Sequence, residues 1–347
     1  MKLKILYLTD LAVAAPKNGD YSKLLLDWEF EDDRKIIETL QSLGHHVQIF
    51  LVHNDLKPLL YEINHYKPDL IFNQCEAFNS DRNAESHFVA LFELLQIPYT
   101  GASAQSLLLC KNKSLSKAIL KANGISTPNS ILVKAFEKPR FTIESPVIVK
   151  PTEQEASVGI NANSYCKTTR EAVERVLTIQ KKYKSDALVE EFIEGREIYL
   201  SVMGRSDPEI YPFRELFFDN FSDHAPKFAT FKSKWDDEFR LIKGIHNGAA
   251  RFVSKKLSQE MLKAAKKINT VFQINGYARI DMRIQKDRYY VLEVNPNPSL
   301  GAEDDFAMSA LQAKISFERL IKIIVSDAFC KKKKKSDNLF HDKQPEI

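Results

Sequence analysis

Two stretches near the C-terminal end of the chain place carboxylates and an amide on predicted strands. Residues 278–284 read ARIDMRI and residues 289–300 read YYVLEVNPNPSL, and the turn QKDR joins the two apolar runs. A carboxylate such as Glu293 at the end of a buried strand must be paired, protonated or bound to a metal, because an isolated buried charge is very costly. Alternate residues of a strand share a face, so pairing of these strands can bring Asp281 beside Glu293 and Asn295.

This group of two carboxylates and an amide allows two interpretations. Hard oxygen ligands of this kind suit Mg²⁺, which takes one or two protein carboxylates and shares its remaining positions among waters and substrate phosphates. The alternative is a salt bridge with Arg279 or Arg283, which lie on the same strand face as Asp281. The spacing alone does not decide between them.

A lysine and the loop after it form a second candidate site. Lys150 ends the apolar run PVIVKP, where a lysine must find an anion or bend to water. The loop from Thr152 to Gly159 could present backbone N–H groups and the Ser157 hydroxyl to phosphate oxygens, although it is poor in glycine. The alternative is a surface lysine followed by an ordinary loop.

The run LVEEFIEGREI is a candidate for nucleoside recognition. The strand end from Glu190 to Ile193 could lie along an adenine edge, with backbone groups and a carboxylate reading its amine. Glu197 could take ribose hydroxyls. The plain alternative is an acidic strand end that faces solvent.

Composition limits the class of protein. A chain of 347 residues with 44% hydrophobic residues is globular and long enough for two or three domains. Residues 331–347 hold six lysines and three acidic residues, so +3 of the net charge of +4 lies there and the other 330 residues are nearly neutral. That balance argues against a nucleic-acid-binding face. The lysine run predicts a basic, disordered tail over 331–347.

The cysteines and the apolar runs bear on compartment. The four cysteines lie far apart without a C-x-x-C pair, which predicts neither a zinc site nor a disulfide framework and favours a reducing compartment. Asp10 interrupts the first apolar run before it reaches the length of a signal peptide. No apolar run approaches the roughly 18 residues of a membrane-spanning helix. We therefore expect a cytoplasmic protein with no membrane partner.

Strand and helix patterns alternate over the first hundred residues, which predicts a parallel sheet with covering helices that ends near residue 104. A helical pattern over 104–122 follows. A second α/β unit contains strands over 146–151 and 187–193. A long polar region with many aromatic residues covers 211–247. Within it, the aromatic residues of 216–243 alternate with charges without periodicity, which predicts a long mobile flap over the nucleotide.

Several runs, taken together, resemble the ATP-grasp superfamily and, within it, the branch similar to D-alanine–D-alanine ligases. They are PDLIFN, IPYTGAS, CKNKSLSKAILKANGISTP, VIVKPTEQEASVGI, LVEEFIEGREI, FKSKW and ARIDMRI with YYVLEVNPNPSL. Each is weak alone, but they stand in the family's order over about residues 68–312. The resemblance implies an α/β ATP-grasp fold, with an N-terminal open parallel α/β domain (1–104) and two α+β subdomains (105–198 and 199–330) that clamp ATP.

The resemblance also implies roles for the matching residues. The ATP-binding residues would be Lys113 and Lys150 for phosphates, Ser157 in the phosphate loop, Glu190, Phe192 and Ile193 for adenine, and Glu197 for ribose. Lys234 in FKSKW would reach the γ-phosphate from a mobile loop, and Arg279 would stabilise the tetrahedral intermediate. Asp281, Glu293 and Asn295 would hold Mg²⁺ or Mn²⁺.

Departures from the family pattern concern the substrate pocket. Residues 8–21 lack the Gly-rich turn whose glutamate holds the first substrate's amine in D-alanine ligases, and Ala156 stands where the family has its first loop serine. Ser299 replaces the family's glycine after E-x-N. Glu303, Asp304 and Asp305 lie where those ligases bind the acceptor's carboxylate. We therefore expect an acceptor that presents a cation toward Asp304 or Asp305, or one that has no free carboxylate there. Alternatively, these acids cap the following helix.

The expected activity is therefore ATP-dependent joining of a small-molecule carboxylate to an amine through an acyl phosphate, with a product other than the D-alanine dimer. A small-molecule kinase with the same ATP site is an alternative. A nucleotide-binding protein that has lost catalysis is another. A homodimer is possible, because members of the family are commonly dimers.

Overall fold

The computed structural model describes residues 2–12, 21, 23–152, 157–205, 207–222 and 225–338, with side chains as far as residue 329. The loop Glu153–Ala156, which the sequence places among the phosphate-binding residues, lies outside them. The chain divides into two compact units. Unit 1 is Met1–Leu107, Ile274–Tyr277 and Pro296–Ile347, and unit 2 is Leu108–Gln273 and Ala278–Asn295. The finer domain boundaries given above stay a prediction.

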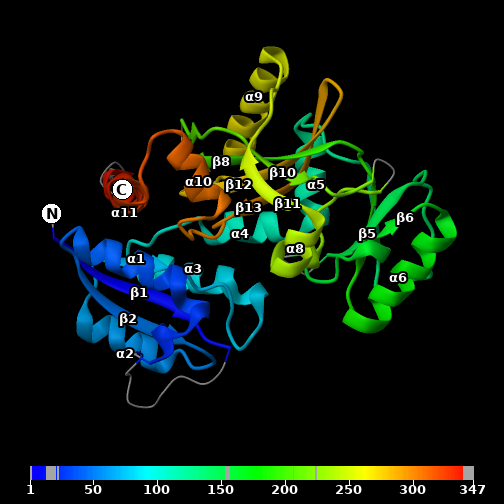
Figure 1. Ribbon diagram of the computed structural model, residues 1–347. Helices are drawn as coiled ribbons and strands as arrows, with labels where there is room; N and C mark the ends of the chain where they lie inside the picture. The colour runs from blue at the N-terminus through cyan, green and yellow to red at the C-terminus, as the bar shows by residue number, and fades with distance from the viewer. Residues whose placement is uncertain are drawn as a thin grey trace, which may run out of the picture. The chain divides into compact units, whose positions relative to one another are not determined.

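Unit 1 contains a parallel sheet in the order β2-β1-β3. Its strands are β1 (Lys4–Asp10), β2 (His46–Val52) and β3 (Leu70–Asn73), and its first three α-helices are α1 (Glu31–Ser42), α2 (Lys57–Tyr66) and α3 (Glu85–Leu94). Leu6 and Leu8 pack in one core with α2 and α3. Tyr7 faces the other side, where its hydroxyl donates to Asp33 of α1 at 2.7 Å. Figure 1 shows α1 and α2 on opposite faces, which confirms the predicted open α/β architecture.

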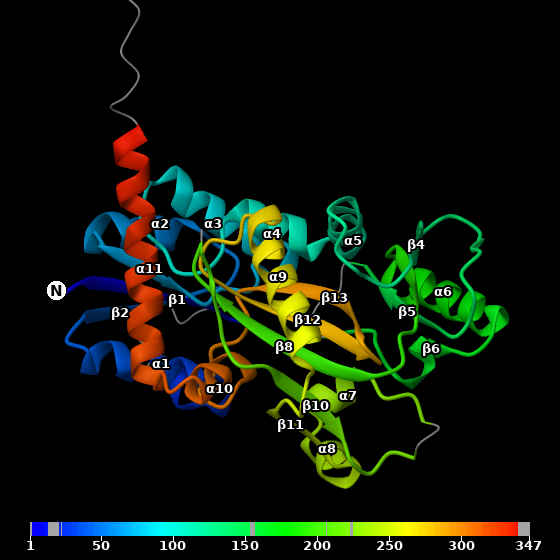
Figure 2. The ribbon, with the colours of Figure 1, turned by 90° about the horizontal axis from the view of Figure 1, so that it is seen from above.

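Two further helices complete unit 1. They are α10 (Asp305–Gln312) and α11 (Phe317–Asn338), and α11 packs against α1 and β3. The backbone of α11 stays helical through the lysine run, as Figure 2 shows, whereas the sequence predicts disorder from residue 331. The difference has a physical reason: lysine is a good helix former, and the packed turns before residue 331 already nucleate the helix.

Unit 2 begins at Leu108, within the region 104–122 that the sequence predicts as one helix, and this helix is broken. The structure has α4 (Ala104–Lys111) and α5 (Lys113–Ala122), separated by Asn112. The Asn112 side chain accepts a hydrogen bond from the Leu115 N–H at 2.9 Å, which caps α5. This cap sets the start of the helix that carries two of the lysines described below.

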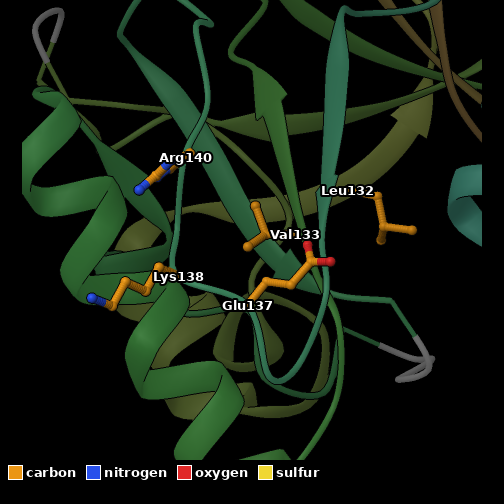
Figure 3. A pocket seen from close by; sticks show the side chains of 5 residues that line it. All are labelled: Leu132, Val133, Glu137, Lys138 and Arg140. Carbon is orange, nitrogen blue, oxygen red and sulfur yellow. The ribbon is translucent and has the colours of Figure 1, made fainter.

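A four-stranded antiparallel sheet follows, in the order β4-β7-β5-β6. Its strands are β4 (Ser130–Val133), β5 (Val147–Pro151), β6 (Tyr165–Cys166) and β7 (Ala187–Glu191), and α6 (Thr169–Tyr183) covers one face. Thr168 and Glu171 form a capping box at the start of α6. Beside β4 lies a cavity of about 310 Å³ (Figure 3), lined by Leu132, Val133, Glu137, Lys138 and Arg140.

The larger sheet of unit 2 has the order β11-β10-β8-β12-β13, with β9 beside β8. Its strands are β8 (Arg196–Met203), β9 (Glu209–Ile210), β10 (Arg214–Phe218), β11 (Ile245–Ala249), β12 (Tyr277–Gln285) and β13 (Arg288–Pro296). The predicted hairpin of β12 and β13 is present. The helix α9 (Lys255–Val271) packs against β8 and crosses this sheet in Figure 2.

The region 216–243 contains regular elements, so the prediction of a long loop there is wrong. Besides the end of β10, it holds α7 (Phe231–Trp235) and α8 (Asp237–Lys243). Thr230 and Ser233 form a capping box on α7, and Asp236 caps α8. Helices of five to seven residues complete too few turns to reveal a 3.6-residue period, which is why the pattern is hidden.

The remaining described elements are four 3₁₀ turns: η1 (Leu24–Leu26), η2 (Trp28–Phe30), η3 (Arg82–Ala84) and η4 (Ala162–Ser164). Cys75, Cys110 and Cys166 are buried and form no disulfide. Within the described residues, no helix has both the length and the apolar composition needed to cross a bilayer.

Candidate functional site

Five buried or partly buried charged side chains of unit 2 gather from four elements. They are Lys113 and Lys117 on α5, Lys150 on β5, Glu190 on β7 and Glu293 on β13. The two α5 lysines lie four residues apart and therefore share one face of the helix. Each of the three lysines is at most 8% exposed.

Glu190 is the centre of the first ion-pair group. Its Oε2 lies 2.5 Å from Lys117 Nζ, and its Oε1 lies 3.2 Å from Lys150 Nζ. Burial would raise the pKa of Glu190, but the two ammonium groups hold it below its usual value. Glu190 is 3% exposed, so it is a buried counter-ion and not an acidic strand end that faces solvent.

Glu293 is the centre of the second group. Its Oε1 lies 3.1 Å from Lys113 Nζ, and 31% of its side chain is exposed. Burial would raise the pKa of Glu293, but the charges of Lys113, Lys150 and Lys234 lower it to about 2. Lys113 thus contacts Glu293 directly, and the charges of Lys150 and of Lys234 on α7 also stabilise its ionised form.

The charges of these five residues do not cancel. Three lysines face two glutamates, which leaves one positive charge among side chains that are largely withdrawn from water. An uncompensated buried charge is costly, so this arrangement favours an anionic ligand. A polyphosphate meets that requirement.

The low pKa of Glu293 predicts acid sensitivity of the apoprotein. The folded-state pKa of about 2 lies below the ordinary value of 4.5, so the stabilisation is complete above pH 4.5 and is lost as the pH falls toward 2. We expect the free energy of unfolding, measured by urea denaturation with a chelator present, to fall by about 1–3 kcal/mol over that window from this group. Glu293→Gln should show a correspondingly shallower fall, and identical pH profiles would contradict the assignment.

Asp281 is held by Arg279 of the same strand. Arg279 Nε donates to Asp281 Oδ1 at 2.7 Å, and Nη2 donates to Oδ2 at 2.9 Å. Arg279 also lies over the Tyr199 ring, 4.6 Å from its centroid. Burial raises the pKa of Asp281 and the nearby Glu293 adds to that rise, whereas Arg279 and Lys234 oppose it. Thus the salt bridge with Arg279 is present, and the two carboxylates still lie near each other.

The predicted metal ligands fit a cation that also binds phosphate. Among the described residues, no three His, Cys, Asp or Glu side chains gather into a metal site of their own. Asp281 and Glu293 supply two carboxylates, and the buried Nδ2 of Asn295 has no hydrogen-bond partner. An amide can turn its oxygen to the place of its nitrogen, which gives a third oxygen ligand. Mg²⁺ needs no more than this when phosphates and waters complete its shell.

Arg283 organises the predicted nucleoside-binding residues. Its Nη1 donates to the Ile193 carbonyl at 3.0 Å, and its Nη2 donates to Glu197 Oε2 at 2.9 Å. Its guanidinium lies 5.3 Å from the centroid of the Phe192 ring. Glu197 also accepts a hydrogen bond from the Tyr199 hydroxyl at 3.1 Å. The sequence identifies Arg283 only as a possible salt-bridge partner of Asp281. The one signal of its nucleoside-site role is that Arg283 lies on the same strand face as Asp281, two residues further along.

Arg175 of α6 anchors the end of the loop that contains Ser157. Its Nη2 donates to the Gly159 carbonyl and, at 3.1 Å, to Ser164 Oγ. Both Ser157 (φ 62°) and Gly159 (φ 79°) have left-handed backbones, a conformation that such an anchor helps to hold. Sequence reasoning missed Arg175, because one arginine on an amphipathic helix carries no specific signal.

Replacing Arg175 by methionine should therefore destabilise unit 2. We expect a loss of about 1.5–3 kcal/mol in the free energy of unfolding, since hydrogen bonds to buried charged groups are of this size. The matched control is Arg170→Met on the same helix, where 90% of the side chain is exposed. Its exposed pair with Glu174 should contribute less than about 0.5 kcal/mol. Equal losses in the two variants, measured by urea denaturation, would contradict the anchoring role.

The predicted substrate residues lie in unit 1. Asp304 precedes α10 as its N-cap residue, but its side chain makes no capping hydrogen bond. Instead, Asp304 Oδ2 accepts hydrogen bonds from Ser299 Oγ and, at 3.2 Å, from the Gly301 N–H. Asp305 is in the first turn of α10. The Asp304 carboxylate therefore occupies the Ser299 hydroxyl and the Gly301 N–H, two donors that could otherwise bind the carboxylate of a substrate.

Comparisons with known proteins agree with this architecture. The family model for the D-ala D-ala ligase C-terminus matches residues 119–326. The D-alanine–D-alanine ligase of Carboxydothermus hydrogenoformans is 34% identical over 247 residues, which cover 68% of this chain and 74% of that protein. The uncharacterized protein y4sG of Sinorhizobium fredii is 27% identical over 302 residues, which cover 84% and 86%.

A solved structure extends the likeness to nearly the whole chain. The D-alanine–D-alanine ligase from Bacillus anthracis, complexed with ATP, matches with a TM-score of 0.73 at 19% identity and covers 96% of this chain and 99% of that chain. This likeness confirms the predicted ATP-grasp fold.

Proposed function

The chain belongs to the D-alanine–D-alanine ligase family of ATP-grasp carboxylate–amine ligases, and on this premise we propose that it joins a small-molecule carboxylate to an amine with ATP. The observation that carries the proposal is the buried cluster in which three lysines face two glutamates. Its excess positive charge suits the polyphosphate of ATP. The nearby Asp281 and Glu293 suit the cation that accompanies that polyphosphate.

The chain's own side chains have distinct roles in this proposal. Lys113 and Lys150 bind phosphate oxygens, and Lys234 of α7 reaches the transferring phosphoryl group. Asp281, Glu293 and Asn295 would hold Mg²⁺, which supplies charge neutralisation and a template for the phosphates. Arg279, oriented by both oxygens of Asp281, donates fixed N–H groups to the oxyanion of the second step.

The proposed reaction has two steps, formation of an acyl phosphate and attack of the amine on it. A carboxylate oxygen of the substrate attacks the γ-phosphorus, the bond to the β-phosphate oxygen breaks, and ADP leaves. The resulting acyl phosphate is an electrophile, unlike the free carboxylate. The amine then attacks its carbonyl carbon, loses a proton, and displaces inorganic phosphate, which retains one oxygen of the original carboxylate. No protein nucleophile is required.

The acceptor side of unit 1 supports a product other than the D-alanine dimer. In D-alanine ligases the positions after E-x-N bind the acceptor's carboxylate, whereas here Asp304 takes donors from Ser299 and Gly301. Asp32 lies beside it: a Cβ at Gly301 would stand 2.5 Å from Asp32 Oδ2 and 2.7 Å from Asp304 Oδ2. Burial raises the pKa of Asp32, and the charge of Asp304 raises it further. Two carboxylates repel an anion and attract a cation.

D-Alanine alone is therefore expected to give no dimer. The purified protein is incubated with ATP, Mg²⁺ and D-alanine, and the products are identified by mass, with an authentic D-alanine–D-alanine ligase as positive control. A panel of carboxylates is then tested with and without diamines and other cationic amines, and ADP release is measured. Efficient formation of the D-alanine dimer would overturn the proposed specificity. ADP release that never depends on an amine would favour a kinase.

A further inference from the structure

Lys117 lies within reach of three oxygen atoms of the protein. Its Nζ lies 2.5 Å from Glu190 Oε2, 3.1 Å from Thr127 Oγ1 and 3.4 Å from the Leu292 carbonyl oxygen. The Thr127 hydroxyl and the Leu292 carbonyl accept hydrogen bonds from this ammonium group, and Glu190 pairs with it as a counter-ion. Lys117 is 3% exposed, and these protein oxygens surround its ammonium group.

Lys150 differs in this respect. Its Nζ contacts Glu190 Oε1 at 3.2 Å, and that is its one hydrogen-bonding partner among the described residues. Two of its three N–H donors can therefore serve a ligand. One oxygen of Glu190 contacts Lys117 and the other contacts Lys150. Because Lys117 neutralises the charge of Glu190, the positive charge of Lys150 remains available to a ligand.

The Lys117 contacts also reach β13, the strand that carries Glu293 and Asn295. Thr127 Oγ1, besides accepting from Lys117, donates to the Val291 carbonyl at 2.7 Å. The Val291 N–H donates to the Ser126 carbonyl at 2.8 Å. Val291 and Leu292 directly precede Glu293 in β13. Lys117 of α5 and Thr127, in the segment after α5, therefore hold the β13 backbone next to Glu293.

From these contacts we infer that Lys117 is a positioning residue of the ATP site. It neutralises Glu190 so that Lys150 remains available to the nucleotide's phosphates, and it holds β13 where Glu293 begins. This inference rests on the proposed ATP-binding function. Without Lys117, Lys150 would be the one ammonium partner of Glu190 among the described residues, and Lys150 would be drawn away from phosphate.

The test compares Lys117→Met, Lys117→Arg and the control Lys121→Met, an exposed lysine one turn further along α5. Calorimetry gives the Kd of ATP, and competition gives the Kd of adenosine. The ratio Kd(adenosine)/Kd(ATP) measures how much the phosphates contribute to ATP binding. We expect Lys117→Met to reduce this ratio about tenfold or more, since a charge-assisted phosphate contact is weakened. Lys117→Arg keeps the charge and should retain more of the ratio than Lys117→Met, while Lys121→Met should match the wild type.

Several outcomes would overturn the inference. If Lys117→Met is folded, as judged by circular dichroism, and its ratio equals that of the wild type, Lys117 does not position the site. A methionine variant that outperforms the arginine variant would show that Lys117 contributes packing alone. If Lys117→Met does not fold, Thr127→Val decides: a fall of about threefold supports the inference, and an unchanged ratio overturns it. A wild-type protein that binds no ATP would instead remove the proposed function, and the inference with it.

Discussion

Replacing Glu293 by glutamine is expected to lower ATP-dependent ADP formation by at least about a hundredfold, because it removes a charged ligand from the proposed cation site. Glu293 also pairs with Lys113 at 3.1 Å, so the same substitution leaves a buried lysine without this carboxylate. Glutamine keeps the size of the side chain and donates where glutamate accepted. The measurement is the rate of ADP release at saturating ATP over a range of Mg²⁺ concentrations.

The control for this experiment lies on the same hairpin. Asp287 is exposed in the turn between β12 and β13, and Asp287→Asn removes one negative charge without touching the cluster. Its ADP release should equal that of the wild type. A folded Glu293→Gln protein with normal ADP release at every Mg²⁺ concentration would remove Glu293 from the site.

Replacing Lys150 by methionine is expected to give the second large loss, roughly 30-fold or more in kcat/KM for ATP, through the loss of a charged phosphate contact. Methionine fills much of the volume of the lysine stem. Glu190 keeps Lys117 as its partner at 2.5 Å, so the variant leaves no isolated carboxylate and should remain folded. Steady-state kinetics with varied ATP measure the effect.

Lys138→Met is the matched control for Lys150→Met. Lys138 is an exposed lysine beside the cavity near β4, in the segment that leads to β5 (Figure 3). It should leave kcat/KM for ATP unchanged. Equal effects of the two substitutions would mean that the loss reflects net charge and not a contact made by Lys150.

The hairpin of β12 and β13 shows why much of the fold can be predicted from the sequence. Its two-residue alternation and the polar turn between the strands are local properties of the chain, so the pattern predicts both strands and the shared face of Arg279 and Asp281. The same holds for β1 to β3 and their helices. The resemblance to ATP-grasp proteins predicted the overall architecture, and the fold comparison confirms it.

Other features depend on packing that no local pattern contains. Lys117 is one of several lysines on α5, and it is buried because Glu190 of β7 and the Leu292 carbonyl of β13, both distant in sequence, lie against it together with Thr127. The role of Arg175 likewise depends on packing, which brings the Gly159 carbonyl and the Ser164 hydroxyl to its guanidinium. The short helices α7 and α8 are fixed by capping at Thr230 and Asp236 more than by apolar periodicity. The pairing of Asp304 with Ser299 depends on how the loop before α10 folds back.

The proposed activity has one direct test, the fate of the carboxylate oxygen. A carboxylate substrate identified from the panel is labelled with ¹⁸O and incubated with the protein, ATP, Mg²⁺ and its amine partner. If an acyl phosphate forms and the amine displaces phosphate, one ¹⁸O atom appears in the released inorganic phosphate for each amide made, as detected by mass spectrometry. Release of ADP and phosphate without ¹⁸O transfer, or without an amide product, would contradict a carboxylate–amine ligase.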